Sequence, residues 1–355
     1  MINQNIALVF GGVSSEHDVS IKSFETIYNA IKESKILSKT LKKIFYITRD
    51  ANVITSNIDF AKNPKEYYKS NEKEKLEKLF SIALEENLFL FSTIHGQYGE
   101  DGSLQGAAKF FGIKNNFGSI LSTSISMSKY HLNRYLDGQI AELNIPQTLQ
   151  ISTIDDIEKI KEFENQQIII KPNSLGSSLF TEKFLCTNEN MKDIIDLINN
   201  ILEFDEKALI QEFIKGEEYS CGCLEKSKDV LVLPIVKIIT DEDFFSHKAK
   251  YTKGNSINNV ILLENETEIE KKLKRISFEI FKELEFNAMV RFDYIIKNEK
   301  IYFLEANTLP GLKSSSIYPS MLKEYNINLE ELITILIDNE LNRDEKQTQL
   351  IYCVS

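Results

Sequence analysis

The hydrophobic pattern at the amino end is typical of an α/β unit. Residues 6–10 form a short apolar run that stops at Gly11-Gly12, which predicts a buried strand followed by a loop. Apolar residues then recur at helical spacing, at Ile21, Phe24, Tyr28 and Ile31. A strand, a loop and a helix in this order predict that the chain opens with an open α/β domain.

Further along, the pattern predicts two more blocks. We expect an N-terminal α/β substrate domain at residues 1–117, a central domain at 118–210 and a C-terminal domain at 211–355. The charged stretch 57–87 is interpreted as a solvated spacer with a surface helix. A helix is predicted to end before Pro146, with its apolar face formed by Leu132, Leu136, Ile140 and Leu143.

The most informative segment lies near the carboxyl end, where two apolar runs flank a short polar turn and predict a β-hairpin. A register with a three-residue loop at 298–300 places four polar side chains on one face, in two opposed pairs: Arg291 with Asn307, and Asp293 with Glu305. The opposite face is assigned to the core. It comprises Val290, Phe292, Tyr294, Ile296, Tyr302, Leu304 and Ala306.

The opposed carboxylates of Asp293 and Glu305 suggest a cation site. At about 5 Å they would repel by roughly 3 kcal/mol at an effective dielectric constant near 20. A hard divalent cation would relieve this repulsion, and oxygens from Asp, Glu and Asn307 are the ligands that Mg²⁺ prefers. The alternative is a surface salt-bridge patch with Arg291. We favour the metal site because the polar residues cluster on one face.

A second candidate is the segment Lys171-Pro-Asn-Ser-Leu-Gly-Ser-Ser178, in which a strand is followed by a loop of small residues. Backbone N–H groups and hydroxyls in such a loop, Ser177 included, can line a phosphate. Neither Gly-x4-Gly-Lys-Ser/Thr nor Gly-x-Gly-x-x-Gly occurs in the chain, so an ordinary turn explains the loop equally well. Together with a magnesium hairpin, however, the lysine indicates a nucleoside triphosphate. Lys129 and Lys250 are further candidates for the phosphates.

Three weaker patterns each have two interpretations. The segment Gln211-Glu212-Phe213-Ile214, followed by Glu218, would suit the base and ribose of an adenosine, although its spacing alone is weak evidence. The segment that carries Lys250 is either a loop that closes over phosphates or an exposed basic loop.

Glu16 follows the glycine pair at the start of the first helix. It either complements the helix dipole or binds a substrate ammonium group. His95, in the glycine-rich loop, is a turn residue or a substrate contact.

Composition narrows the class of protein. The 355 residues carry a net charge of −11, and the pI near 5.1 argues against a nucleic-acid binder. No apolar stretch approaches the roughly 20 residues that span a bilayer, and the N-terminus lacks the features of a signal peptide, so we expect a cytoplasmic protein without a membrane partner. Cys221 and Cys223 alternate along a predicted strand and are interpreted as core residues.

Several motifs, in this order along the chain, resemble the D-alanine–D-alanine ligase family. They are Gly11-Gly-Val-Ser-Ser-Glu-His-Asp-Val-Ser20, His95-Gly, Gly99-Glu-Asp-Gly-Ser-Leu-Gln-Gly106, Lys171-Pro-Asn-Ser-Leu-Gly-Ser-Ser178, Ala249-Lys-Tyr251, Arg291-Phe-Asp293 and Leu304-Glu-Ala-Asn-Thr-Leu-Pro-Gly311. The resemblance implies a three-domain ATP-grasp fold of mixed α/β (α+β) type. It also implies ATP-dependent joining of two D-alanines through a D-alanyl phosphate, in peptidoglycan precursor synthesis, by a homodimer.

The resemblance also implies roles for individual residues. Asp293, Glu305 and Asn307 would bind two Mg²⁺, for which Mn²⁺ can substitute; Lys129, Lys171 and Lys250 would contact phosphates, and Glu218 the ribose. Glu16 would bind the first D-alanine with help from His95, and would form a hydrogen-bonded link with Ser177 and Tyr251. Arg291 and the Gly311 N–H would stabilise an oxyanion, while Ser316 and Ile317 would contact the second D-alanine.

The chain also departs from the family pattern. Leu175 replaces a common acidic residue, Ser128 replaces the usual Asp before Lys129, and either Gln211 or Glu212 meets the adenine. Lactate-using relatives of the family carry a His-containing version of the loop, so the resemblance at Tyr251 implies D-alanine as the second substrate. Two alternatives remain: another ATP-grasp ligase, including one that forms D-alanine–D-lactate or D-alanine–D-serine, or a non-catalytic nucleotide-binding module.

Overall fold

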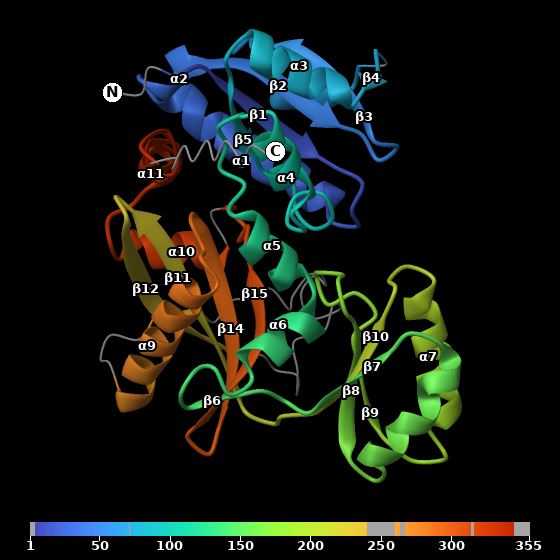
Figure 1. Cartoon of the computed structure of the whole chain (residues 1–355). Helices are drawn as coiled ribbons and strands as arrows, with labels where there is room; N and C mark the ends of the chain where they lie inside the picture. Colours follow the sequence, from blue (N-terminus) through green and yellow to red (C-terminus); the bar gives the residue numbers. More distant parts are fainter. Residues whose placement is uncertain (1–3, 71, 240–259, 263–266, 314–315, 344–355) are drawn as a thin grey trace, which may run out of the picture.

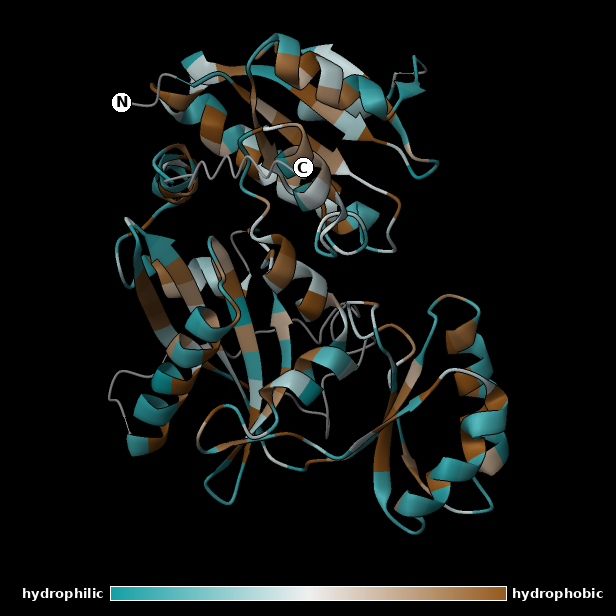
Figure 2. Cartoon of the chain, viewed as in Figure 1, coloured by the Kyte–Doolittle hydropathy of each residue, from teal (hydrophilic) through white to brown (hydrophobic). Residues whose placement is uncertain are grey.

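The computed structural model describes residues 4–70, 72–239, 260–262, 267–313 and 316–343. This part of the chain folds into three β-sheets, each with its own helices (Figure 1). Figure 2 shows hydrophobic residues along the strands and polar residues on outward helix faces such as that of α9 (Glu268–Glu283). Within the described residues, no helix is both long enough and apolar enough to cross a bilayer.

The first sheet has the strand order β4-β3-β2-β1-β5. Its strands are β1 (Ile6–Gly11), β2 (Leu41–Ile47), β3 (Asn52–Asn57), β4 (Glu74–Lys75) and β5 (Phe89–Ser92), and its helices are α1 (His17–Glu33), α2 (Leu37–Thr40), η1 (Pro64–Tyr68), α3 (Glu77–Glu85) and α4 (Ser103–Phe110). β1 pairs in parallel with β2 and β5. Leu8 and Phe10 pack with α1, whereas Val9 packs with α3 and α4 on the other face. Both faces of β1 are therefore buried, which explains its unbroken apolar run and confirms the predicted strand and helix.

The interpretation of 57–87 as a solvated spacer is wrong. β4 extends the sheet by pairing with β3, and α3 buries Leu79 completely. Tyr67 is only 2% exposed and packs with α1. The abundant charges lie on the outer side of elements whose few apolar residues belong to the core.

The second sheet is antiparallel, with the order β7-β10-β8-β9. Its elements are β7 (Thr148–Ile151), η2 (Ile154–Phe163), β8 (Gln167–Pro172), β9 (Glu182–Leu185), α7 (Met191–Leu202) and β10 (Ala208–Glu212). η2 and α7 cover one face through a core that includes Phe163, Ile170 and Ile198. The other face is therefore left to contribute to a cavity.

The third sheet has the order β13-β12-β11-β14-β15-β6. Its strands are β6 (Leu143–Asn144), β11 (Glu217–Lys226), β12 (Asp229–Ile238), β13 (Val260–Leu262), β14 (Met289–Lys297) and β15 (Lys300–Asn307), and its helices are α5 (Ile120–Met127), α6 (Lys129–Leu136), α9, α10 (Ile317–Lys323) and α11 (Leu329–Leu341). α6 and α9 share a core with Cys221 and Cys223 on one face, so both cysteines are core residues as predicted. α10 and α11 pack on the opposite face, and α11 also contacts the first sheet's α1 (Figure 1).

Two predicted boundaries need comment. The helix expected to continue to Leu143 ends at Leu136, because Gly138 adopts φ 75° and the chain then enters β6. Ile140 and Leu143 nevertheless reach the same core as Leu132. The domain boundary expected at 210/211 falls inside β10, and α5, α6 and β6 accompany the third sheet rather than the second.

The hairpin register is correct at one end and wrong at the other. Arg291 pairs with Asn307 and Asp293 with Glu305, as predicted. Beyond this point Tyr294 pairs with Phe303, so Leu304 is an extra residue and the loop has two residues rather than three. Both loop residues, Asn298 and Glu299, have positive φ, as a tight hairpin turn requires.

The extra residue reverses which side chains of β15 face the core in the part of the strand that precedes Glu305. Ile301 and Phe303 enter the core, whereas Tyr302 is only half-buried and Leu304 lines a cavity. The assignment of Tyr302 and Leu304 to the core face is therefore wrong. Alternation alone could not locate the bulge, because both faces of this strand carry apolar residues.

Candidate functional site

Two adjoining cavities lie where the three sheets meet. The smaller, of about 140 Å³, lies between the second and third sheets, and the larger, of about 560 Å³, lies between the first sheet and the third. Four charged residues line both cavities: Lys129, Glu218, Asp293 and Glu305. A group in one cavity would therefore lie next to a group in the other.

The structure places all the described candidate residues around these cavities. The smaller cavity is lined by Lys129, Lys171, Gln211, Glu212, Phe213, Ile214, Glu218, Asp293 and Glu305. The larger is lined by Glu16, His95, Ser177, Arg291, Asn307, Gly311, Ser316 and Ile317, as well as by the four shared residues. Lys250 and Tyr251 lie outside the described residues.

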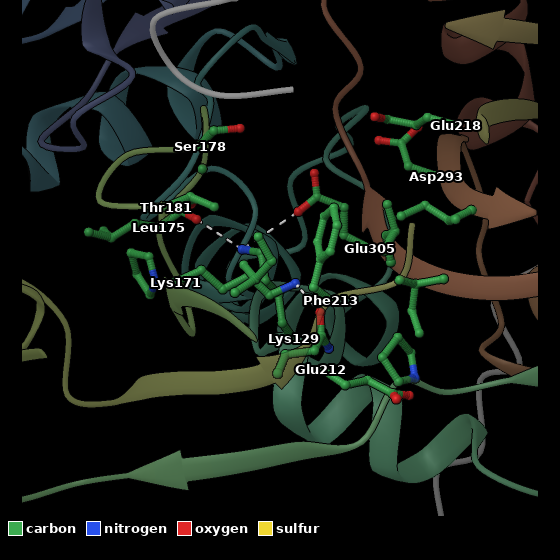
Figure 3. A pocket seen from close by; sticks show the side chains of 18 residues that line it. Lys129, Lys171, Leu175, Ser178, Thr181, Glu212, Phe213, Glu218, Asp293 and Glu305 are labelled. Atoms are coloured by element: carbon green, nitrogen blue, oxygen red, sulfur yellow. Dashed lines mark hydrogen bonds and ion pairs between the residues drawn. The ribbon is translucent and has the colours of Figure 1, made fainter. Parts of the chain in front are cut away.

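Lys171 is a residue of β8, and its side chain lines the smaller cavity (Figure 3). Its Nζ donates to Gln211 Oε1 at 3.0 Å, and Gln211 Nε2 donates to Thr148 Oγ1 at 2.8 Å. Burial lowers the pKa of Lys171 to about 8; Glu305 opposes this effect and the positive charge of Lys129 adds to it. The lysine is thus a cation held by a neutral partner.

The polar side chains of Gln211 and Glu212 form hydrogen bonds within the protein. Gln211 is 3% exposed and engages both ends of its amide, with Lys171 and Thr148. Glu212 Oε1 accepts from the Gln147 backbone N–H at 3.0 Å. The side chain of Gln211 therefore orients Lys171.

Lys129, the first residue of α6, joins the second and third sheets. Its Nζ donates to the Leu175 carbonyl at 2.9 Å and lies 3.8 Å from Glu305 (Figure 3). Asn173 reinforces this junction, because its Oδ1 accepts from the Tyr130 N–H at 3.0 Å and its carbonyl from the Lys129 N–H. Asn173 lies in the small-residue loop, but the sequence analysis gave it no role.

The small-residue loop reaches across to the first domain. Ser177 Oγ donates to Glu16 Oε1 at 2.6 Å. Ser177 and Ser178 both adopt left-handed backbone conformations, with φ 56° and 54°, which are unfavourable for non-glycine residues. A Cβ at Gly176 would collide with the Glu16 carboxylate, so glycine permits this close approach.

The polar face of the hairpin holds a network around Asp293. Arg291 donates to both Asp293 oxygens, from Nε at 2.8 Å and from Nη2 at 2.7 Å. Asn307 Nδ2 and Ser220 Oγ also donate to this carboxylate, at 2.8 and 2.5 Å. Burial would lower the pKa of Arg291, but the adjacent Asp293 raises it above its ordinary value, so the guanidinium stays charged. The salt bridge considered as an alternative to a metal site is therefore present.

The same residues fit a hard divalent cation. Asp293, Glu305 and Asn307 carry oxygen donors and all border the larger cavity. In the described part of the chain no three His, Cys, Asp or Glu side chains gather into a metal site, so the candidate set is two carboxylates and an amide. Such a small set suits an ion that keeps waters and substrate phosphates among its ligands.

The first-domain wall of the larger cavity holds His95 and Glu100. His95 is 5% exposed; its Nε2 lies 2.9 Å from Ser23 Oγ and its Nδ1 3.9 Å from Glu100 Oε1. Glu100 accepts hydrogen bonds from the segment that follows β15. The sequence analysis included Glu100 in the motif at residues 99–106 but gave it no role of its own.

The segment after β15 also lines the larger cavity. Ser316 is the N-cap of α10, and a Cβ on Gly311 would lie 3.2 Å from Ser316 Oγ. Gly311 and Ser316 therefore lie side by side. Both residues line the larger cavity together with Arg291 and Glu16, and the Ser316 N–H donates to the Lys313 carbonyl at 2.7 Å.

Known proteins resemble the chain along most of its length. The family model described as D-ala D-ala ligase N-terminus matches residues 5–116, and that described as D-ala D-ala ligase C-terminus matches residues 143–338. The D-alanine–D-alanine ligase of Azobacteroides pseudotrichonymphae is 31% identical, over 95% of this chain and 99% of its own.

Solved structures share the fold. The VanG D-Ala:D-Ser ligase from Enterococcus faecalis superimposes with a TM-score of 0.75 at 22% identity, over 96% of this chain and 100% of its own. The D-alanine–D-alanine ligase from Bacillus anthracis complexed with ATP superimposes with a TM-score of 0.69 at 24% identity, over 95% of this chain and 97% of its own. The mixed α/β architecture with three sheets is thus that of the ATP-grasp ligases.

Proposed function

The chain belongs to the D-alanine–D-alanine ligase family, and on this premise we propose a reaction for its two cavities. The protein is an ATP-dependent ligase that joins two D-alanines into D-alanyl-D-alanine for peptidoglycan precursor synthesis. The carboxylate of the first D-alanine attacks the γ-phosphate of ATP, giving D-alanyl phosphate and ADP. The amine of the second D-alanine then displaces phosphate from the acyl carbon.

The observation that carries this proposal is the shared wall of the two cavities. A nucleotide in the smaller cavity and amino acids in the larger one would meet at Lys129, Asp293 and Glu305. Phosphoryl transfer requires such a meeting point, where the phosphoryl donor and the acceptor are held in line and the charge is neutralised.

For the nucleotide, we assign the phosphates to Lys129 and Lys171, with Lys250 from outside the described residues. The base packs against the segment from Gln211 to Ile214, and Glu218 binds the ribose hydroxyls. Support comes from the position of these described residues around one cavity and from the charge of Lys171, which its neutral partner Gln211 leaves available.

For the metal, we assign Asp293, Glu305 and Asn307 as ligands of Mg²⁺, with Mn²⁺ as a substitute. When bound, this ion would neutralise charge on the transferred phosphoryl group. The supporting observation is the row of oxygen donors on one face of the hairpin, at the wall that both cavities share.

For the amino acids, Glu16 binds the ammonium group of the first D-alanine, and His95 lines the same end. The hydrogen bond between Glu16 and Ser177 holds the small-residue loop next to this site, and Tyr251 is proposed to extend that link. Arg291 and the Gly311 N–H stabilise the oxyanion that forms when the second amine attacks. Ser316 and Ile317 contact the second D-alanine.

A coupled ADP assay tests the reaction, with D-alanine, L-alanine, D-serine and D-lactate supplied in parallel. We expect ADP release that depends on D-alanine, and a product with the mass of the dipeptide. A mixed product with D-serine or D-lactate would assign the chain to another specificity. No D-alanine-dependent ADP release would refute the proposed reaction and favour a non-catalytic nucleotide-binding module.

A double substitution tests the metal assignment. Asp293→Asn with Glu305→Gln keeps the side-chain size but removes both anionic ligands, so we expect Mg²⁺-dependent turnover to be abolished. Binding of Mn²⁺ to the protein, followed by electron paramagnetic resonance, should weaken in parallel. An unchanged Mg²⁺ titration would show that the hairpin does not hold the ion.

We also propose that the protein is a homodimer in the cytoplasm. The compartment follows because ATP and the precursors of the cell wall are supplied there. Exposed aromatic residues at the end of α4 support an interface between copies: Phe110 is 86% exposed and Phe111 is 45% exposed. Light scattering during size-exclusion chromatography should give twice the 40.9 kDa of the chain. The mass of one chain at micromolar concentration would contradict the dimer.

A further inference from the structure

We propose that Glu100 is a positioning residue, which fixes the segment after β15 against the first-substrate wall of the larger cavity. Glu100 belongs to the glycine-rich loop of the first domain. The segment that it holds directly follows β15 and belongs to the domain built on the third sheet. The inference rests on the proposed function and adds to it a residue that neither the nucleotide site nor the metal site uses.

Three donors from two parts of the chain meet on this one carboxylate. Oε1 accepts from the Gly96 N–H at 2.9 Å, within the loop itself. Oε2 accepts from Thr308 Oγ1 and from the Leu309 N–H, both at 2.9 Å, although these residues lie 208 and 209 positions away in sequence. The Glu100 side chain is only 15% exposed, so these bonds replace most of its contact with water.

Within the described residues, no lysine or arginine forms an ion pair with the buried Glu100 carboxylate. In the described part of the chain its one ion-pair contact is with His95, whose Nδ1 is 3.9 Å away and depends on protonation for its charge. Glu16 lies close enough to oppose a negative charge at Glu100. A buried carboxylate without a full cationic partner costs free energy, and the hydrogen bonds from the domain built on the third sheet offset that cost.

The held segment explains why this contact matters for the reaction. Thr308 follows the proposed metal ligand Asn307, and Leu309 lies two residues before Gly311. On the other side, Ser14 Oγ donates to the His95 carbonyl at 2.6 Å, which ties the Glu100 loop to the loop that bears Glu16. Glu100 therefore sets the distance between the end that binds the first amino acid and the end that carries the ion and the oxyanion donor.

Glu100→Gln is the sharpest test, because it keeps the size of the side chain but replaces one acceptor oxygen with an NH₂ donor that faces N–H groups. We expect kcat/KM for D-alanine to fall by about 10- to 100-fold, the range for losing a hydrogen bond to a charged group. The affinity for an ATP analogue should be unchanged, because Glu100 does not border the smaller cavity. Thr308→Val should cause a smaller loss, and the double variant should be no worse than Glu100→Gln alone.

Glu330→Gln is the matched control. Glu330 on α11 also joins the first domain to the domain built on the third sheet, through a 2.6 Å hydrogen bond from Ser34 Oγ, but it borders neither cavity. It should leave both parameters unchanged. A Glu100→Gln variant with normal D-alanine kinetics would overturn the proposal, as would equal losses for ATP and D-alanine together with a lowered Tm.

Hydrogen–deuterium exchange separates this inference from the proposed reaction. In substrate-free protein, Glu100→Gln should speed amide exchange in the peptide 307–313, because the Leu309 N–H loses its charged acceptor. This outcome would support the contact even in a chain that joined no D-alanine. Unchanged exchange would refute the contact even if the ligase assay succeeded.

Discussion

The burial of Lys171 leads to a pH dependence of ATP binding. Burial lowers the pKa of this lysine from 10.5 to about 8. Phosphate oxygens favour the charged amine, so above that pH the binding of ATP is accompanied by uptake of a proton by the Lys171 amine. Affinity should therefore be constant below about pH 8 and should fall above it, by up to about tenfold per pH unit.

The substitution Gln211→Glu changes this behaviour by a calculable amount. Gln211 Oε1 lies 3.0 Å from Lys171 Nζ, and a carboxylate there would stabilise the charged amine by about 1.4 kcal/mol even at the dielectric constant of water. This energy corresponds to about one pKa unit, and a lower dielectric constant increases it. The start of the fall in affinity should thus move from about pH 8 to pH 9 or higher.

Isothermal titration calorimetry with a non-hydrolysable ATP analogue, from pH 7 to pH 9.5, measures this directly. Titrations in buffers of different ionisation enthalpy should also show proton uptake at pH 9 in the wild type and less in Gln211→Glu. At pH 7 the variant should bind the analogue more weakly, because the new carboxylate pairs with Lys171 and repels the phosphates.

Gln166→Glu provides the control, since it adds the same charge to the exposed turn before β8. Its affinity profile should match that of the wild type. The reasoning would be refuted by wild-type affinity that stays constant from pH 7 to pH 9.5. A fall that starts at the same pH in the wild type and in Gln211→Glu would refute it equally.

Two further substitutions test the amino-acid end of the site. Arg291→Ala should lower kcat by on the order of 10²–10³, because it removes an oxyanion donor and leaves Asp293 without its cation; near-normal kcat would remove the assigned role. Gly176→Ala should raise KM for D-alanine more than KM for ATP, because the added methyl group would displace the Glu16 carboxylate, and equal effects on both would contradict this account of the loop.

The local pattern of hydrophobic and polar residues was enough to predict several helices and strands of this protein. The apolar run before Gly11 predicted β1, the helical spacing after it predicted α1, and two apolar runs around a polar turn predicted the hairpin and the pairing of Asp293 with Glu305. These features depend on neighbours a few residues apart, or on one short turn, so the alternation and period of side chains suffice to specify them. The motifs along the chain also sufficed to indicate the family.

Tertiary structure decided how these pieces meet. The sequence carries no local signal for the bulge at Leu304, because it is set by how β15 packs between a core and a cavity. The bonds from Ser177 to Glu16 and from Thr308 to Glu100 join residues 161 and 208 positions apart. Lys171 likewise finds its hydrogen-bond partner, Gln211, on a neighbouring strand, and burial between the sheets lowers its pKa. Such contacts form only when separate sheets pack together, so the chemistry of each side chain was visible in the sequence but its partner was not.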